Sequence, residues 1–599
     1  MVNPVPTADL PLPFHSQRRR SREVMVGRVA LGVDHPVRVQ SMLTCDTMDT
    51  EACVRDSMAL AALGCEIVRI TAPTVKDARN LEAIRDGLRA QGCDVPLVAD
   101  IHFKPDAAME SAKWVEKVRV NPGNYADSKK FAVREYTDEQ YAAEIGRIRE
   151  KFAPLVKLCQ ERGSAMRIGT NHGSLSDRIM NRYGDTPLGM VESALEFARI
   201  ARELDYHNFV FSMKASNPKV MIAAYRLLVS RLAAEGPDWN YPIHIGVTEA
   251  GDGEDGRIKS AVGIGSLLAD GIGDTIRVSL TEDSVHEIPV AQELVDLFAG
   301  NCEGWVGGQQ LSFDPFSYAR RASEKIKINS IPLGGDEVPR VVVTRRHYDA
   351  VAHRLPGLGD FQPEFVYEDL PVVEVDPRDA TAVTELNARG EACLVTVRDD
   401  IGLPVIAAFR LLAAQADPRH PILLKDSLDP QPDPQSPFVR TLLGASARLG
   451  SLLCDGIGDA VLLRTEDAPG QTLRLAYNIL QAVGARIFKT DYVACPSCGR
   501  TLFNLQDTTA RIKAATAHLK GVKIAIMGCI VNGPGEMADA DFGYVGGAPG
   551  KVNLYIGKKP VKFNIPEAEA VDRLVDLIKE NGRWLALPAS TSSAVFHEL

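Results

Sequence analysis

The sequence predicts an α/β protein that begins with a TIM barrel over residues 1–299. Between residues 37 and 298, short β-branched runs alternate with amphipathic helical stretches. This alternation is typical of parallel βαβ units, and about eight units over roughly 260 residues match a closed barrel. An open, doubly wound sheet is the alternative. It is disfavoured because no glycine-rich dinucleotide motif follows the first strand.

The expected strands of this N-terminal barrel are rich in valine and isoleucine, and many of them end in polar residues. In a parallel barrel the C-terminal strand ends form one mouth, where active sites lie. The sequence therefore predicts a polar site at that mouth. The expected strands cover residues 37–42, 67–70, 97–103, 117–121, 166–171, 209–214, 243–249 and 275–280.

Residues 300–485, the middle unit, continue in α/β style, with expected strands at 340–344, 393–397, 404–409 and 422–426. GSLLADGIGD at 265–274 recurs here as GSLLCDGIGD at 450–459, which indicates duplication of a barrel unit. After the repeat, Arg277 and Ser279 correspond to Leu462 and Arg464. We therefore expect a degenerate, barrel-like insert that has lost its polar mouth and serves as a spacer or interface.

Residues 486–599, the C-terminal unit, are expected to form an α+β domain. It has candidate strands at 523–527 and 552–557, a helix near 567–579 and a frayed tail at 588–599. Three of the 11 cysteines of the chain cluster in this unit, whereas the other eight are scattered singly. Scattered cysteines in apolar surroundings are typical of small buried residues, so the cluster is the chemically informative part.

Composition and charge exclude several classes of function. The formal net charge of −10 argues against a general nucleic-acid binder. No apolar run is long enough to span a membrane, and no secretion signal is recognisable. An odd number of cysteines without such a signal indicates a reducing compartment, so a cytoplasmic protein is expected. The basic run at 15–22 is expected to be a solvated arm.

Five cations and two carboxylates are expected at the mouth of the N-terminal barrel. Residues two apart on a strand share a face, which brings these side chains together. Cations packed with few counter-charges are unfavourable unless an anion binds, and guanidinium groups match phosphate oxygens. The sequence therefore predicts a small polyanionic ligand such as a diphosphate. The cations are Arg69, Arg119, Arg167, Lys214 and Arg277, and the carboxylates are Asp100 and Glu249.

Further polar residues accompany these charges at the strand ends. Asn121, Asn171 and Ser279 each share a strand face with one of the arginines. Glu249 is the better candidate for an acid, while Asp100 could orient either His102 or a substrate hydroxyl. For His102, a structural and a catalytic role both remain open. Structural ion pairing at the strand ends is the alternative for any one of these residues.

The clustered cysteines form a Cys495-Pro-Ser-Cys498 motif followed by Cys529 in the stretch GCIVNGPGE. Three thiolates leave one coordination position open, whereas a structural zinc site is normally closed by four ligands. His518 lies in a predicted helix and is poorly placed to close such a site. Glu536 follows a Gly-Pro-Gly turn that could swing it back. A [4Fe–4S] cluster is therefore favoured, with zinc or a disulfide switch as alternatives.

Several longer motifs make a family resemblance specific. ACPSCGR, GCIVNGPGE, VADIHF, RVNPGN, RIGTNHGSL, SMKASN, TEAG and GIGDTIRVSL occur across the N-terminal barrel and the C-terminal unit. With these motifs the chain resembles the 4-hydroxy-3-methylbut-2-en-1-yl diphosphate synthase family. The middle unit is similar to the insert of the long, three-domain form of that family.

The resemblance implies a reaction and a set of roles. The substrate would be 2-C-methyl-D-erythritol 2,4-cyclodiphosphate, reduced with ring opening to an allylic diphosphate in non-mevalonate isoprenoid biosynthesis. Ferredoxin or flavodoxin would supply the electrons, and a homodimer is left open. Glu249 would be the proton donor and Asp100 a substrate-orienting carboxylate. The implied cluster ligands are Cys495, Cys498, Cys529 and Glu536, and the implied diphosphate ligands are Arg119, Asn121, Arg167, Asn171, Lys214, Arg277 and Ser279.

Two other classes of protein remain as alternatives. A non-redox, phosphate-binding barrel transferase with a zinc knuckle would contain zinc and tolerate oxygen. A non-catalytic iron–sulfur scaffold or electron carrier would leave the cationic mouth unexplained. A radical enzyme of the CxxxCxxC type is disfavoured because that cysteine spacing does not occur.

Overall fold

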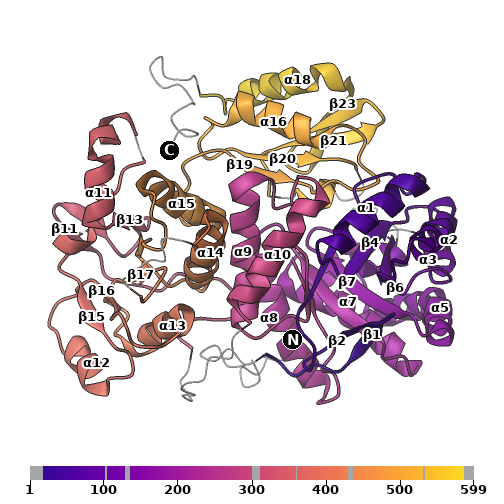
Figure 1. Cartoon of the computed structure of the whole chain (residues 1–599), viewed down its shortest axis with the longest axis horizontal. Coiled ribbons are helices and arrows are strands. Elements are labelled where there is room, and N and C mark those ends of the chain that lie inside the picture. Colours follow the sequence, from indigo (N-terminus) through magenta and orange to yellow (C-terminus); the bar gives the residue numbers. More distant parts are fainter. Residues whose placement is uncertain are drawn as a thin grey trace.

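The computed structural model describes residues 18–101, 104–127, 135–299, 311–358, 361–429, 436–530, 533–537 and 539–585. The predicted site residue His102 and the predicted tail at 588–599 lie outside these ranges. Figure 1 shows the N-terminal barrel in indigo and magenta, the middle unit in salmon and brown beside it, and the C-terminal unit in yellow above both.

The N-terminal barrel is built from eight parallel strands in the order β8-β7-β6-β5-β4-β3-β10-β9. A parallel bridge between Phe211 and Ile243 joins β8 to β9, so the sheet closes on itself. This closure confirms the predicted TIM barrel over the open sheet. The strands are β3 (Arg38–Met42), β4 (Ile67–Thr71), β5 (Leu97–Ile101), β6 (Lys117–Val120), β7 (Ala165–Asn171), β8 (Phe209–Lys214), β9 (His244–Ile245) and β10 (Thr275–Ile276).

Helices begin where the sequence supplies capping residues. Thr74 and Thr137 accept backbone hydrogen bonds at the starts of α2 and α5 and form capping boxes there. Proline occupies the first turn of α7 and α8, where its missing N–H costs little. The barrel helices are α1 (Thr50–Ala62), α2 (Val75–Ala90), α3 (Pro105–Ser111), α4 (Pro122–Tyr125), α5 (Asp138–Arg162), α6 (Asp177–Tyr183), α7 (Pro187–Glu203), α8 (Pro218–Glu235), α9 (Gly253–Ala269) and α10 (Glu287–Leu297).

A short hairpin covers the N-terminal end of the barrel. Its strands β1 (Val24–Val26) and β2 (Val29–Leu31) pair antiparallel. Val24, Val26 and Leu31 form one apolar cluster with side chains from the starts of barrel strands, including Ile67 and Ala165. Apolar packing thus covers the N-terminal end of the barrel, and the predicted polar site lies at the C-terminal ends of the strands.

The arm before the hairpin is docked, so the prediction of a solvated arm is wrong for its described residues. Arg18 donates to Asp274 at 2.7 Å, and Arg19 donates to the carbonyl of Tyr241 at 2.8 Å. The physical reason is that Asp274 is buried and a buried carboxylate requires a partner. Asp459 at the matching repeat position receives Arg320 at 2.9 Å, so the duplication includes this contact.

The middle unit is a partial copy of the barrel, as predicted. Its parallel strands follow the order β14-β13-β18-β17, and a bridge between Val395 and Ile422 adds β16 and then β15. This order reproduces β4-β3-β10-β9-β8-β7, so counterparts of β5 and β6 are missing from the described part of the unit. The strands of the unit are β11 (Ile326–Ile328), β12 (Ile331–Leu333), β13 (Arg340–Val343), β14 (Phe365–Val366), β15 (Val373–Val375), β16 (Val395–Val397), β17 (Leu423–Lys425) and β18 (Ala460–Leu462), and its first two α-helices are α11 (Arg345–Val351) and α12 (Ala380–Asn387).

The two copies of the repeated motif meet at the contact between the barrels. In the first copy, α9 packs against α14 (Phe438–Cys454) of the second (Figure 1). A Cβ added to Gly265 would lie 2.5 Å from the Cβ of Ala447, and one added to Gly450 would lie 2.3 Å from Val262. The hydroxyls of Ser266 and Ser451, at equivalent positions, are 2.8 Å apart. Small residues thus allow the two helices a close, nearly symmetric approach.

Four buried charges reinforce this contact. Arg226 of α8 binds Asp270 at 2.7 Å and Asp455 at 2.8 Å. Arg410 of α13 (Val405–Gln415) binds the same two carboxylates, at 2.7 and 2.8 Å. Each aspartate follows its own copy of the repeated helix. Because two arginines are matched by two aspartates, the cluster is internally neutral.

Two predictions for the middle unit are corrected. Residues 404–409 were expected to form a strand, but they begin helix α13, because a short apolar run buried on several sides fits either element. The strand ends also keep polar groups. Lys425 is fully buried and binds Asp399 at 3.0 Å and Glu374 at 3.3 Å, and Arg464 pairs with Asp399 as well. This mouth is therefore polar but neutralised by its own residues.

The C-terminal unit is a five-stranded mixed sheet in the order β19-β20-β21-β22-β23. The first three strands run parallel and the last two are antiparallel. In Figure 1 helices α16 and α18 lie on the outer side, away from the two barrels. The elements are β19 (Asp491–Ala494), α16 (Leu505–Thr516), β20 (Lys523–Met527), α17 (Gly533–Glu536), β21 (Phe542–Ala548), β22 (Lys551–Ile556), β23 (Lys559–Pro566) and α18 (Glu567–Glu580).

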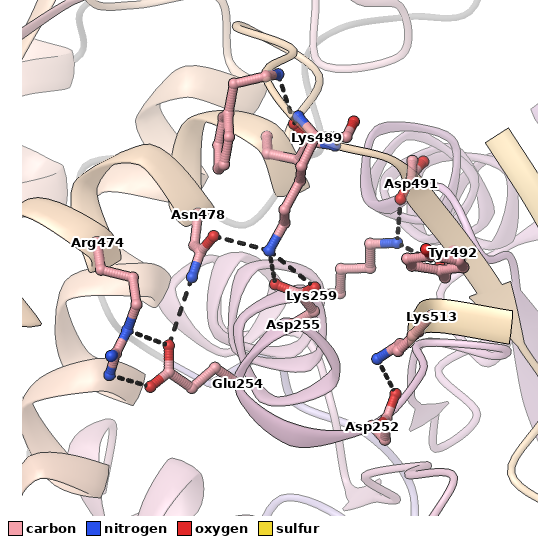
Figure 2. A network of polar contacts seen from close by, with 12 residues as sticks. Asp252, Glu254, Asp255, Lys259, Arg474, Asn478, Lys489, Asp491, Tyr492 and Lys513 are labelled. Carbon is pink, nitrogen blue, oxygen red and sulfur yellow. Dashed lines mark hydrogen bonds and ion pairs between the residues drawn. The ribbon is translucent and has the colours of Figure 1, made fainter. Parts of the chain in front are cut away.

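Charged residues at the start of α9 join all three units (Figure 2). Acids are favoured in the first turn of a helix, and here each acid also binds a cation from another unit or from the connecting segment. One turn further on, Lys259 donates to Asp491 at 2.8 Å and to the carbonyl of Tyr492 at 3.0 Å. The network holds the C-terminal unit in place over the barrel. Its other pairs are Asp252 with Lys513, Glu254 with Arg474 of α15 (Pro469–Ala482), and Asp255 with Lys489.

Among the described helices, none combines the length and the apolar character that a membrane crossing requires.

Candidate active site

One pocket lies between the mouth of the N-terminal barrel and the cysteine motifs of the C-terminal unit. The five predicted cations and the three clustered cysteines all line it. The barrel contributes Met42, Arg69, Arg119, Arg167, Asn171, Lys214, Thr248, Glu249, Arg277 and Ser279 to the walls. The C-terminal unit contributes Cys495, Pro496, Ser497, Cys498, Arg500, Thr501, Met527, Gly528, Cys529 and Gly533.

Strand register brings the first group of charges together. Asp100, Arg119 and Arg167 are direct partners across β5, β6 and β7, so their side chains share a face. Asp100 accepts hydrogen bonds from Arg69 at 2.7 Å and from Arg119 at 2.9 Å. One buried carboxylate is therefore shared by two arginines, which leaves an excess of positive charge.

Arg277 has a carboxylate partner that the sequence did not reveal. Glu287, the first residue of α10, accepts from Arg277 at 3.2 and 3.1 Å and from the hydroxyl of Ser41 at 2.6 Å. Both Arg277 and Glu287 are almost fully buried. Glu287 lies outside the strand-end pattern on which the prediction rested, and an acid at a helix start is too common to stand out. The pair fixes the guanidinium at the pocket wall.

Arg167 and Lys214 carry positive charge without a carboxylate within 4.0 Å among the described residues. Burial and the neighbouring arginines lower the pKa of each group well below its ordinary value. Glycines make room for them: a Cβ on Gly246 would lie 3.1 Å from the Lys214 amine, and one on Gly169 would lie 3.4 Å from Nε of Arg167. A bound anion would relieve this unfavourable charge.

The remaining predicted ligands divide into two groups. Ser279 lines the pocket, and Asn171 lines it while accepting from Arg119 at 3.1 Å. Asn121 caps α4 by accepting from the Gly123 amide at 3.1 Å, and it donates to Ser174 at 3.2 Å. Its polar atoms are thus already engaged, and it is absent from the described pocket wall.

Glu249 is the carboxyl group with the most unusual environment. It follows β9 with a φ of 54°, a conformation that costs energy in a residue with a side chain. Thr248 donates to one of its oxygens at 3.2 Å, while the other oxygen is buried without a hydrogen-bond partner in the described structure. Burial and the nearby carboxyl of Glu536 raise the pKa of Glu249 well above its ordinary value. The group can therefore hold a proton at neutral pH.

The cysteines enter from two loops of the C-terminal unit. Cys495 directly follows β19, and its sulfur accepts from the Gly528 amide at 3.1 Å. Ser497 has a φ of 65°, so the Cys495–Cys498 turn is bent sharply toward the pocket. Within the described ranges, no three His, Cys, Asp or Glu side chains converge tightly enough to hold one metal ion.

Glu536 is placed beside both the barrel and the cysteine motifs. Asn171 donates to one of its carboxyl oxygens, and the other oxygen is buried and lacks a hydrogen-bond partner in the described structure. A buried carboxyl oxygen without a partner is unfavourable and is suited to a ligand or an ion. Three thiols and such a carboxyl form a donor set that fits an iron–sulfur cluster with one replaceable ligand.

Backbone contacts seat the C-terminal unit directly on its own barrel. Ala250 and Ala494 form a parallel bridge, and Thr281 donates to the carbonyl of Cys495 at 3.0 Å. Gly173 and Gly535 touch so closely that a Cβ on either one would lie within 2.1 Å of the other's carbonyl oxygen. The pocket is thus closed within one chain.

Comparisons with known proteins agree with these features. A family model for the GcpE TIM-barrel domain matches residues 21–292, and one for the GcpE protein C-terminal domain matches residues 491–580. The 4-hydroxy-3-methylbut-2-en-1-yl diphosphate synthase (flavodoxin) of Akkermansia muciniphila is 59% identical over 579 residues, which cover 96% of this chain and 98% of the relative. The protein of the same name from Leptospira interrogans is 45% identical, with 96% and 98% covered.

Solved structures are more distant. Dihydropteroate synthase from Thermus thermophilus is 16% identical and covers 46% of this chain and 99% of that one, with a TM-score of 0.29. A likeness at that level bears on neither fold nor function. The full-length relatives, in contrast, confirm the resemblance predicted from the motifs. This chain belongs to the GcpE family, the 4-hydroxy-3-methylbut-2-en-1-yl diphosphate synthases.

Proposed function

We propose that the pocket carries out the reaction for which the family is named. The enzyme converts 2-C-methyl-D-erythritol 2,4-cyclodiphosphate into 4-hydroxy-3-methylbut-2-enyl diphosphate in isoprenoid biosynthesis. Two electrons and one proton open the ring at a C–O bond and release a hydroxyl as water. The observation that supports this most directly is a single pocket with barrel cations on one side and three cysteines on the other; Asn171 of its wall also donates to Glu536 of the C-terminal unit.

We infer that Cys495, Cys498, Cys529 and Glu536 hold a [4Fe–4S] cluster. Their donor atoms fit it, because three thiols leave one iron for a weaker carboxylate ligand and Glu536 has an oxygen without a hydrogen-bond partner in the described structure. When bound, such a cluster would supply electrons one at a time and a Lewis-acidic iron.

The barrel residues bind and orient the diphosphate. Arg167 and Lys214, which lack carboxylate partners among the described residues, supply most of the uncompensated charge, while Asp100 and Glu287 hold the other arginines in fixed positions. Glu249 holds a proton and donates it to the departing oxygen. Closure of the C-terminal unit excludes water from the reduced substrate.

The names of the relatives, which specify flavodoxin, support that protein as the electron donor in preference to ferredoxin. We retain the division into units at 299/300 and 485/486 and assign the middle unit a structural role, because its polar mouth is neutralised internally.

The test is iron, sulfide and zinc per chain after anaerobic purification, followed by turnover of the cyclodiphosphate with reduced flavodoxin. About four irons and four sulfides per chain, with product formation, support the proposal. One zinc without sulfide after anaerobic reconstitution, and no turnover, would instead favour the non-redox transferase.

A further inference from the structure

One cation of the pocket comes from the C-terminal unit. Arg500 stands two residues after Cys498, and it lines the same pocket as the barrel arginines. Its side chain is only 10% exposed. The positively charged wall is thus built from both units, although the pattern of strand ends revealed only the barrel's share.

Two nitrogens of this guanidinium are left over. One terminal nitrogen lies 3.5 Å from a carboxyl oxygen of Asp100. Nε and the other terminal nitrogen are buried and meet no hydrogen-bond acceptor in the described structure. Buried donors without acceptors are unfavourable, so the arrangement is suited to an anion that supplies oxygens.

Asp100 cannot neutralise Arg500 alone, because the carboxylate already accepts hydrogen bonds from Arg69 and Arg119. Three guanidinium groups around one carboxylate leave net positive charge at the point where the two units meet. A guanidinium group remains protonated in proteins, so Arg500 is charged inside the pocket.

The position of Arg500 depends on the closed arrangement of the units. Its neighbour Gly499 lies against the barrel, where an added Cβ would be 2.8 Å from the carbonyl oxygen of Cys45 and 3.0 Å from the hydroxyl of Thr71. Only a residue without a side chain allows this approach. Seating of the loop on the barrel thus carries Arg500 into the pocket.

We propose that Arg500 is a substrate-binding residue contributed by the C-terminal unit, whose two free nitrogens donate to the diphosphate when it occupies the barrel mouth. The diphosphate then contacts both units at once. This inference rests on the proposed function. It extends that function by giving the cysteine-bearing unit a direct part in recognising the substrate.

The test uses the anaerobically purified holoenzyme and inorganic diphosphate as the probe, with binding measured by calorimetry. Arg500→Gln should weaken binding tenfold or more, and Arg500→Lys should fall between this variant and the wild type, because lysine keeps the charge but loses the planar fork. The KM for the cyclodiphosphate should rise in the same order. Arg511→Gln, which removes one exposed cation from the same unit, is the matched control and should bind as the wild type does.

Binding of diphosphate by Arg500→Gln within twofold of the wild type would overturn the inference. If Arg500→Gln does not retain its iron and sulfide, the Arg500→Lys variant decides: unchanged affinity and KM in this variant would also overturn it. A wild-type holoenzyme that turns over the cyclodiphosphate while Arg500→Gln binds normally refutes only the role of Arg500. A wild-type protein that neither binds diphosphate nor forms product refutes the proposed function itself.

Discussion

The contact between Gly173 and Gly535 offers a sharp test of whether closure within one chain is needed for turnover. Gly173 follows β7 of the barrel, and Gly535 directly precedes Glu536 in the C-terminal unit. A Cβ on Gly173 would lie 2.0 Å from the carbonyl oxygen of Gly535, whereas real Cβ atoms essentially never come closer than 3.0 Å. In Gly173→Ala the two backbones must therefore separate by at least about 1 Å.

Two costs follow from this change. Gly173 has a φ of 74°, so alanine there destabilises the folded protein by roughly 1–2 kcal/mol. The separation also shifts Glu536 away from the pocket, and misplacement by 1 Å in an active site can reduce the rate by about 100-fold. We expect a small loss of thermal stability, a retained complement of iron, and turnover reduced by about 100-fold.

Gly163→Ala is the matched control. Gly163 has a φ of 66° at the end of α5, but a Cβ added there meets nothing within 4 Å. This variant should show the same loss of stability in a thermal melt and normal turnover with a chemical reductant. Full activity of Gly173→Ala in that assay would show that the closed contact is not required, and the argument from closure would then fail.

Three further changes test the charges. Glu249→Gln should keep the visible spectrum of the cluster and lose about 100-fold or more in turnover. Because the pKa of Glu249 is raised, wild-type turnover should fall as the pH rises through it, and unchanged turnover in the variant would remove Glu249 from the proton path. Burial lowers the pKa of Lys117 to about 7, so wild-type unfolding free energy should increase between pH 7 and 10.5 by up to roughly 5 kcal/mol. In guanidinium unfolding Lys117→Met should lack this increase, and an identical pH slope would contradict the assignment. Asp455→Asn should cost about 3–5 kcal/mol of unfolding free energy, because it leaves Arg226 and Arg410 with one carboxylate, whereas a loss below about 1 kcal/mol would refute that role.

Strand periodicity made the barrel half of the site predictable. Parallel strands in register place residues of the same phase on one face, so Arg119 and Arg167 could be placed in one mouth from sequence spacing alone. The cysteine motif was equally informative, because few functions require three thiols in this pattern. The roles assigned to these residues remain predictions.

Contacts between distant segments could not be predicted in the same way. Glu287 pairs with the pocket residue Arg277 from a helix start, and Arg500 enters the pocket from a loop. In neither place does a periodic pattern fix the direction of a side chain. The middle unit shows a further limit. From the two aligned positions Leu462 and Arg464, the mouth of the middle unit was expected to have lost its polar character. Lys425 and Asp399 lie outside those positions, and their opposite charges neutralise each other. Spacing predicts which residues share a strand face, and it does not predict partners from other elements.

The near-symmetric packing of α9 against α14 has a consequence for how the molecule assembles. Two barrels related by duplication meet through equivalent residues, as subunits of a twofold dimer would, but a single chain connects them. Their association is therefore intramolecular, and its equilibrium does not change when the protein is diluted. Because both copies lie in one chain, their amino-acid sequences can also differ from each other. One copy can keep uncompensated cations at its mouth while the other carries a self-neutralised set of charges, a difference that identical subunits cannot have.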